Sequence, residues 1–410
     1  MKDLTELTTH CIRCGFCLEA CPTFTTTASE LESPRGRIYL VRSAAEGKLR
    51  WQEDVKEHLD RCLGCRACET ACPSGVEYGA ILEMARDQIE RQKPELAKSL
   101  LLKSTTNSKL LDLQLKLGNL LPGKRIPNLL SRWISGSAAE ADRPQPQPEG
   151  SLPPLSDSQL PPLVGEIYLL EGCAMRVLYP RVHEATRRLL RRIGYKVREV
   201  EQGCCGALHA HNGHLAEAAS LADTLIQSFP DKDLAVIVNS AGCGSTMKEY
   251  GDLLPQDRAS AGLDFSKRVF DLSEFLLANG LKDHLQSAHG LNITATYHDA
   301  CHLSHGQKVR VQPRELIECI PQIRYVELGE ADTCCGSAGI YNVTQPKLAR
   351  ALLERKWANI VASEATVVAT GNPGCHAWVG QAAREHGCQV KVLHTAELLE
   401  ATFIGIEAFN

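Results

Sequence analysis

The chain has 410 residues, a length that favours two or three domains over one. Hydrophobic residues make up 43% of it and charged residues 23%, a balance typical of a folded globular protein with apolar cores. The formal net charge of -4 is small for this length, so the chain lacks the basic excess of proteins that bind nucleic-acid phosphates. We therefore expect no nucleic-acid partner.

Cysteine is the informative residue type, with 18 copies. A secreted disulfide scaffold would be shorter and would begin with a basic and then an apolar segment, whereas residues 1–6 carry acids and no apolar run. No stretch approaches the ~18 consecutive apolar residues of a membrane-spanning helix. The sequence therefore indicates a reducing compartment, the cytoplasm, where spaced thiols bind metal more often than they form disulfides.

Residues 1–92 contain the pattern C-x2-C-x2-C-x3-C-P twice, as in bacterial ferredoxins. Three thiolates of such a run surround one 4Fe–4S cluster, and the fourth, which has passed onto a helix, points to the neighbouring cluster. The spacing thus predicts two clusters that exchange their fourth ligand. The predicted ligands are Cys11, Cys14, Cys17 and Cys72 for the first cluster, and Cys62, Cys65, Cys68 and Cys21 for the second.

Structural zinc is the alternative for these cysteines, because C-x2-C pairs also bind zinc. A zinc site takes its four ligands from two pairs, however, and not from four cysteines in one run. The duplicated run with its prolines therefore favours iron–sulfur clusters. Two adjacent clusters imply one-electron relay and not bond-making chemistry.

Residues 93–134 are rich in leucine and lysine and predict one or two amphipathic helices. Two interpretations stay open for residues 100–132: contact with a bilayer surface or a partner subunit, or packing on the chain's own core. Residues 135–163 gather prolines among serine, glycine and acidic residues, and this composition predicts a semi-extended linker.

An internal repeat occupies the rest of the chain, as residues 164–285 and 286–410. Each copy contains a cysteine, then Cys-Cys-Gly, then another cysteine, and the copies are offset by 128, 130 and 132 positions. Short strand-like runs precede the single cysteines, at 167–170, 236–239, 293–297 and 366–370, with helical periodicity between them. The predicted fold class is α+β: a mostly helical two-cluster domain followed by two α/β units with parallel sheets.

The repeated cysteines are candidates for an additional redox site in each half, or for one shared between the halves. They are Cys173, Cys204, Cys205 and Cys243 in the first copy, and Cys301, Cys334, Cys335 and Cys375 in the second. The alternative is that they are buried thiols at strand ends. Nearby histidines, at 209, 211, 214, 298, 302 and 305, are more often satisfied polar groups than ligands, and no site is built on them.

Motifs for organic cofactors are missing. The sequence shows no G-x-G-x-x-G after a strand, no P-loop and no nucleophile elbow. Electrons from an organic substrate need a two-electron carrier that can pass them on singly. We therefore expect FAD on a partner subunit and not on this chain.

The ordered motifs resemble those of the bacterial glycolate oxidase iron–sulfur subunit family over nearly the whole chain. The motifs that carry the resemblance are residues 14–17, 33–40, 58–63, 170–173, 203–206 and 334–339. The resemblance implies a membrane-associated complex whose FAD-binding subunits oxidise glycolate, and often D-lactate. This chain would relay the electrons through its clusters toward quinone, as a peripheral protein on the inner face of the cell membrane.

Related Cys-Cys-Gly chains occur in anaerobic glycerol-3-phosphate dehydrogenase and in heterodisulfide reductase, which implies an alternative. In that alternative the Cys-Cys-Gly region itself reduces a quinone or a disulfide. The heterodisulfide reductase pattern ends each unit in C-x-x-C, whereas this chain has Thr246 and Trp378 at the final positions. Each unit is one cysteine short, which argues against disulfide reduction.

Overall fold

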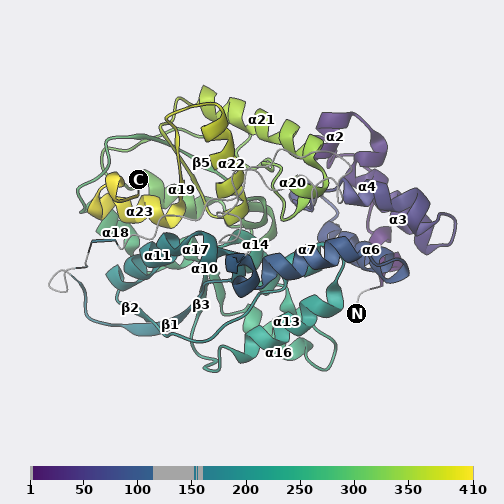
Figure 1. The fold of residues 1–410 in the computed structure, drawn as a ribbon, viewed down its shortest axis with the longest axis horizontal. Helices are drawn as coiled ribbons and strands as arrows, with labels where there is room; N and C mark the ends of the chain where they lie inside the picture. Colours follow the sequence, from purple (N-terminus) through teal and green to yellow (C-terminus); the bar gives the residue numbers. More distant parts are fainter. Residues whose placement is uncertain (1–2, 114–151, 154, 156–159, 410) are drawn as a thin grey trace.

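A computed structural model describes residues 3–113, 152–153, 155 and 160–409 (Figure 1). A helical N-terminal part lies at one end of the molecule, and two α/β units occupy the rest (Figure 1). The fold class predicted from the sequence is therefore confirmed. Most of the predicted linker and residues 114–134 of the leucine-rich segment lie outside the described residues.

The N-terminal part is made of short helices around an apolar core. The first cysteine run is a loop that ends at a helix, whereas the second run contains a short helix at Ala67–Thr70. Pro22 and Pro34 begin helices because proline suits the first helical turn. Val55, Ile81 and Ala85 are fully or almost fully buried in this core. The elements are α1 (Leu4–Thr9), α2 (Pro22–Thr27), η1 (Glu30–Glu32), α3 (Pro34–Ala45), the π-turn η2 (Trp51–Val55), α4 (Lys56–Asp60), α5 (Ala67–Thr70) and α6 (Tyr78–Gln92).

Helix α7 (Leu96–Thr106) crosses the middle of the molecule and contacts both α10 and α12 of the first repeat (Figure 1). Leu102 is completely buried, and Lys98 forms a buried ion pair with Glu90 at 2.7 Å. The opposite side of the helix remains apolar as well, since Leu96 and Leu100 are 75% and 67% exposed. One face of α7 therefore packs on the chain, and the other is free.

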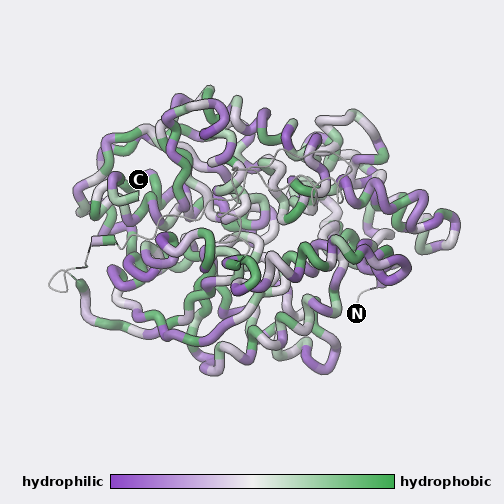
Figure 2. The backbone as a smooth tube through the Cα atoms, viewed as in Figure 1, coloured by the Kyte–Doolittle hydropathy of each residue, from purple (hydrophilic) through white to green (hydrophobic). Residues whose placement is uncertain are grey.

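The two repeats have the same topology. All strands are parallel, in the orders β2-β1-β3-β4 and β6-β5-β7-β8. The strands are β1 (Gly165–Leu170), β2 (Tyr195–Val197), β3 (Val236–Val238), β4 (Val269–Asp271), β5 (Thr294–His298), β6 (Arg324–Tyr325), β7 (Val367–Thr370) and β8 (Lys391–His394). The four central strands are those that the apolar runs predict. Figure 2 colours the backbone by hydropathy and shows hydrophobic and hydrophilic stretches interspersed throughout the fold.

Helices cover both sheets. In the first repeat they are α10 (Cys173–Leu178), α11 (Pro180–Arg192), α12 (Ala207–His211), α13 (Leu215–Gln227), α14 (Ala241–Met247), α15 (Tyr250–Leu253), α16 (Ala259–Ser266), α17 (Leu272–Ala278) and α18 (Leu281–Gln286). In the second they are the π-turn η4 (His302–Gly306), α19 (Val311–Glu318), α20 (Tyr341–Thr344), α21 (Pro346–Ala362), α22 (Pro373–Glu385), α23 (Thr395–Ile404) and η5 (Ile406–Phe409).

The repeats share one core and do not form separate globules. Helix α11 packs on α23, where the fully buried carboxylate of Glu400 accepts hydrogen bonds from Arg188 at 2.6 Å and from Arg192 at 2.8 Å. The N-terminal part is held by both repeats. Tyr341 of the second repeat donates to the Arg61 carbonyl at 2.9 Å, and the His211 carbonyl of the first repeat accepts from Arg86 at 2.6 Å. All three parts therefore meet at the centre of the molecule.

Candidate iron–sulfur site

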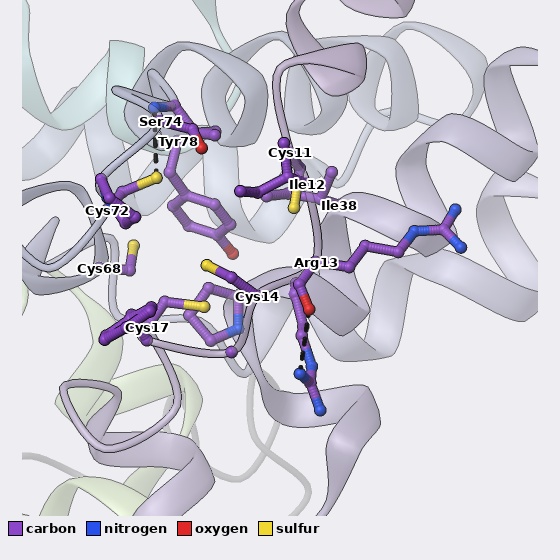
Figure 3. A pocket seen from close by; sticks show the side chains of 16 residues that line it. Cys11, Ile12, Arg13, Cys14, Cys17, Ile38, Cys68, Cys72, Ser74 and Tyr78 are labelled. Atoms are coloured by element: carbon purple, nitrogen blue, oxygen red, sulfur yellow. Dashed lines mark hydrogen bonds between the residues drawn. The ribbon is translucent and has the colours of Figure 1, made fainter.

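The first predicted ligand group lies around one small pocket of about 30 Å³. Cys11, Cys14 and Cys17 come from the loop between α1 and α2, and Cys72 follows α5 (Figure 3). Gly15 has φ +90°, a left-handed conformation that folds the loop around this space. Cys68 lines the same pocket, so the second predicted group is a direct neighbour. The structure thus brings together three cysteines of the first run and the last cysteine of the second.

This first site is close to the surface. Cys14 is exposed, and Cys11, Cys17 and Cys72 are half-buried. Two large apolar side chains beside the thiols face solvent, since Ile12 is 68% and Phe16 69% exposed. Large exposed apolar side chains next to a redox site are typical of a partner surface.

The second predicted group is buried. Cys21, Cys62, Cys65 and Cys68 all lie in the interior and influence one another electrostatically. The Gly64 N–H donates to Cys62 Sγ at 3.4 Å, and the Tyr78 hydroxyl lies 3.4 Å from the same sulfur. Donors aimed at sulfur stabilise the negative charge of a bound cluster.

Buried arginines supply positive charge to this second site. Burial alone would raise the pKa of Cys62, but the Arg37 and Arg86 guanidinium groups bring that pKa below its ordinary value. Arg37 is itself 1% exposed and donates to Glu32 at 2.7 Å and to the Thr23 hydroxyl at 3.0 Å. Arg86 donates to the Leu59 and Cys62 carbonyls, both at 2.7 Å. The surroundings of Cys62 therefore suit a thiolate, as an iron–sulfur cluster requires. Burial and the neighbouring thiols instead hold the pKa of Cys65 and that of Cys68 well above their ordinary value.

The cysteines of each repeat form a separate group. In the first repeat Cys173 Sγ lies 3.6 Å from Cys204 Sγ, and Cys205 contacts both Cys204 and Cys243. The second repeat has the same arrangement, made of Cys301, Cys334, Cys335 and Cys375. Both groups lie where strands end, as the sequence predicts for parallel sheets.

A histidine distinguishes the second repeat from the first. His298, the last residue of β5, is completely buried. One of its ring nitrogens and the Cys335 and Cys375 sulfurs are three donor atoms within 4.8 Å of one another. Sequence reasoning set this histidine aside. Comparison of the two copies could have singled out His298, because the equivalent position of the first copy holds the apolar residue Leu170. The second repeat therefore offers five candidate donors and the first offers four.

The second repeat's group adjoins the second predicted cluster site. The Cys301 thiol acts electrostatically on Cys65, and Cys65 shares an apolar cluster with Cys334, Cys335 and Cys375. Thiol groups therefore follow one another from the exposed Cys14 to the buried interior of the second repeat.

A large central cavity was not predicted from the sequence. It measures about 860 Å³ and lies between the two repeats, beneath α7. Cysteines of both repeats line it, and Leu101 and Ser104 of α7 form part of its wall. The histidines at 211 and 302, which the sequence left unassigned, also line it.

Within the described ranges, no helix is both long and apolar enough to cross a membrane.

Comparison with known proteins gives a consistent result. Residues 8–76 match the 4Fe-4S dicluster domain family, and residues 167–248 and 295–380 each match the cysteine-rich domain family. The chain is 35% identical to a probable glycolate oxidase iron-sulfur subunit of Bacillus subtilis, covering 95% of this chain and 93% of the relative. It is 32% identical to the glycolate oxidase iron-sulfur subunit of Escherichia coli, with the same coverage. A fumarate reductase (CoM/CoB) subunit of Methanothermobacter marburgensis is 27% identical over 96% of this chain and 72% of its own length.

Proposed function

The chain belongs to the glycolate oxidase iron–sulfur subunit family, and from this premise we propose that it carries electrons from FAD-binding partner subunits that oxidise glycolate, and also D-lactate, toward a quinone. It is an electron-transferring iron–sulfur subunit of an oxidoreductase complex. The observation that carries the proposal is the succession of thiol groups from the exposed Cys14 inward to the second repeat.

The proposed ligands are those that the spacing predicts. Cys11, Cys14, Cys17 and Cys72 would hold the first cluster, and Cys62, Cys65, Cys68 and Cys21 the second. The pocket that the first four share and the N–H and guanidinium groups around Cys62 support this assignment. Bound clusters supply reversible one-electron transfer, and the chain's own part is to hold the thiolates, exclude water and balance their charge.

Electrons would enter at the first site. Ile12 and Phe16 lie beside its cysteines, and the Arg13 guanidinium sits 5.2 Å from the centre of the exposed Tyr39 ring. An aromatic and apolar surface of this kind, with an arginine in it, has the composition of an interface core. We assign it to the FAD-binding subunit.

A third redox site would lie in the second repeat. Its proposed donors are the four cysteines of that repeat together with His298, which lies against the Cys335 thiol and is buried with it. Thiolate and imidazole are both ligands of iron. The first repeat has Leu170 in place of the histidine, so it is the poorer site. Its cysteines at 173, 204, 205 and 243 would remain thiols on the cavity wall.

Contact with the inner face of the membrane would come from the free face of α7. Leu96 and Leu100 are exposed there, with the exposed Lys93 and Lys103 nearby. Leucine with lysine on one helix face is typical of helices that lie on anionic bilayers.

The disulfide-reducing alternative is less supported. The positions that carry a fifth cysteine in that pattern hold Thr246 and Trp378, both buried. Neither side chain can replace a thiolate as a ligand or nucleophile.

The test is a complex assembled with and without this chain. We expect glycolate-dependent reduction of a short-chain quinone only when the chain is present. Unchanged quinone reduction by the flavin subunits alone would show that the relay role is wrong.

A further inference from the structure

We propose that the central cavity is where the quinone binds and that His211 is the residue that delivers protons to it. This inference rests on the proposed function, in which electrons leave the chain to a quinone. It adds the place of the reaction and the acid that completes it.

The cavity has the size and lining of a site for an apolar ring with a tail. Ligand pockets usually measure about 300–1,000 Å³ and combine an apolar wall with a few polar groups. This cavity measures about 860 Å³, and Met175, Leu178 and Ile340 contribute apolar wall to it. The cysteines of both repeats lie on the same wall, so a molecule in the cavity is next to the innermost redox groups of the chain.

His211 is held as a proton donor would be. His211 is the last residue of α12, and its Nδ1 lies 2.7 Å from Oε1 of Glu83 on α6. The ring of His302 packs against it edge-on, with centroids 4.6 Å apart, and the His211 carbonyl accepts a hydrogen bond from Arg86 at 2.6 Å. Both the orientation and the tautomer of the imidazole are therefore fixed.

The other ring nitrogen is unused. His211 Nε2 is buried and has no hydrogen-bond partner in the part of the chain that the structure describes, although the residue lines the cavity. A buried polar atom without a partner costs free energy, which favours a role for it with a ligand. With Nδ1–H donating to the Glu83 carboxylate, the charged ring carries its second proton on Nε2.

The reaction balances with these groups. Reduction of a quinone to a hydroquinone takes two electrons and two protons, and each C=O becomes C–OH. Oxidation of glycolate on the partner supplies the electron pair, which arrives one electron at a time. His211 gives a proton from Nε2 to one quinone oxygen and later recovers a proton from solvent, while water in the cavity protonates the other quinone oxygen. Its side chain is 26% exposed, so water reaches the pair.

Helix α7 would be the entrance. Its inner side carries Leu101 and Ser104 on the cavity wall, and its outer side carries the exposed Leu96 and Leu100. The apolar side chains on both sides of this helix would guide an apolar molecule from a bilayer to the cavity.

The first experiment uses the complete complex and the His211→Gln variant. Glutamine keeps a donor for Glu83 but carries no transferable proton. We expect kcat for short-chain quinone to fall at least about 100-fold, the usual contribution of a general acid, with KM unchanged. Glycolate-driven bleaching of the iron–sulfur absorbance should keep its wild-type rate.

The matched control is His284→Gln, at an exposed histidine near the end of α18. Wild-type quinone turnover in His211→Gln would overturn the role of His211.

The second experiment measures quinone binding by equilibrium dialysis and needs no glycolate. Ser104→Trp should fill the cavity and abolish binding, whereas Lys267→Trp at the exposed end of α16 should leave the Kd unchanged. His211→Gln should still bind quinone. Undiminished quinone binding by Ser104→Trp would overturn the location. The location would also be overturned if the wild-type complex reduced a disulfide, oxidised glutathione, and Ser104→Trp blocked that reaction, because the cavity would then be a disulfide site. Failure of glycolate to bleach the wild-type complex would instead refute the proposed function and leave the binding result standing.

Discussion

His302 Nε2 lies 3.0 Å from the Gly64 carbonyl oxygen and so joins the second repeat to the second cysteine run. Burial, with help from the neighbouring His211 and Arg66, holds the pKa of His302 well below its usual value. The ring is therefore neutral near neutral pH, and its Nε2–H donates to the carbonyl. Because Gly64 lies between Cys62 and Cys65, this bond fixes the second cysteine run against the second repeat.

Replacement of this histidine should loosen the junction. We expect His302→Phe to lose about 1–3 kcal/mol, since the buried Gly64 carbonyl would have no donor in its place. The measurement is the urea midpoint for loss of the iron–sulfur absorbance. His284→Phe on the exposed end of α18 is the control, and an equal shift in both variants would contradict a specific role for the junction.

The ligand assignment predicts iron contents. Cys14→Ser should remove the first cluster, about four irons, and leave the spectrum of the second. Cys388→Ser is the matched control, because Cys388 is also an exposed cysteine but lies in neither a cysteine run nor a repeat group. Iron analysis measures the number of irons per chain, and electron paramagnetic resonance spectroscopy shows which cluster signal is lost. A full iron content in Cys14→Ser would remove this residue from the ligand set.

The asymmetry between the repeats predicts where any further iron is bound. Two clusters require about eight irons per chain, and a third site raises the total to about twelve. We expect His298→Leu, which copies Leu170 of the first repeat, to lower the content toward eight. Cys204→Ser in the first repeat should not change it. Loss of iron in Cys204→Ser alone would instead place the extra site in the first repeat.

Much of the fold could be predicted because its signals are local. The cysteine runs have fixed spacing, and the central strands are mostly buried. Strand β3 therefore appears as an uninterrupted apolar run, and β1, β5 and β7 appear as short runs of apolar, aromatic and β-branched residues. The edge strands were not predicted. Strand β6 has only two residues, Arg324 and Tyr325, and neither is apolar and buried, so no periodicity marks it.

The candidate site could be predicted only where a recognised spacing pattern marks it, as in the duplicated cysteine run. The pair of Glu83 and His211 joins residues that are 128 positions apart, and no pattern in one sequence connects them. His298 differs from Leu170 at the equivalent position of the first repeat, but this difference alone does not show that its donor atom lies beside Cys335 and Cys375. The cavity depends on how three parts of the chain pack together, which spacing does not encode.

The exposed apolar residues at the first site predict a partner interface. Phe16→Asp should prevent stable association with the FAD-binding subunit, because a charge would have to be buried at the centre of the interface. We expect at least about a tenfold weaker Kd, which corresponds to about 1.4 kcal/mol. The measurement is co-purification followed by titration. Leu263→Asp on α16 is the control, as that leucine is 54% exposed and lies in the first repeat. If both variants associate equally well, the entry surface lies elsewhere.

Two buried histidines at the contact between the repeats predict sensitivity to acid. Burial lowers the pKa of His183 to about 4 and that of His394 to about 3. His394 accepts from the Ala396 N–H at 3.1 Å and donates to the Asn239 carbonyl at 2.8 Å, a pattern that only the neutral ring can make. In the unfolded chain these rings take up protons near pH 6.5.

The folded state binds fewer protons than the unfolded state below that pH, so acid favours unfolding. Stability should be intact above about pH 7 and should fall by about 2 kcal/mol per histidine between pH 7 and pH 5. Urea unfolding followed by circular dichroism measures the dependence. His394→Gln should be less stable at pH 7 but should lose about 2 kcal/mol less on acidification, whereas the exposed His284→Gln should follow the wild type. Equal acid sensitivity in wild type and His394→Gln would mean that His394 does not couple protonation to the packing of the two repeats.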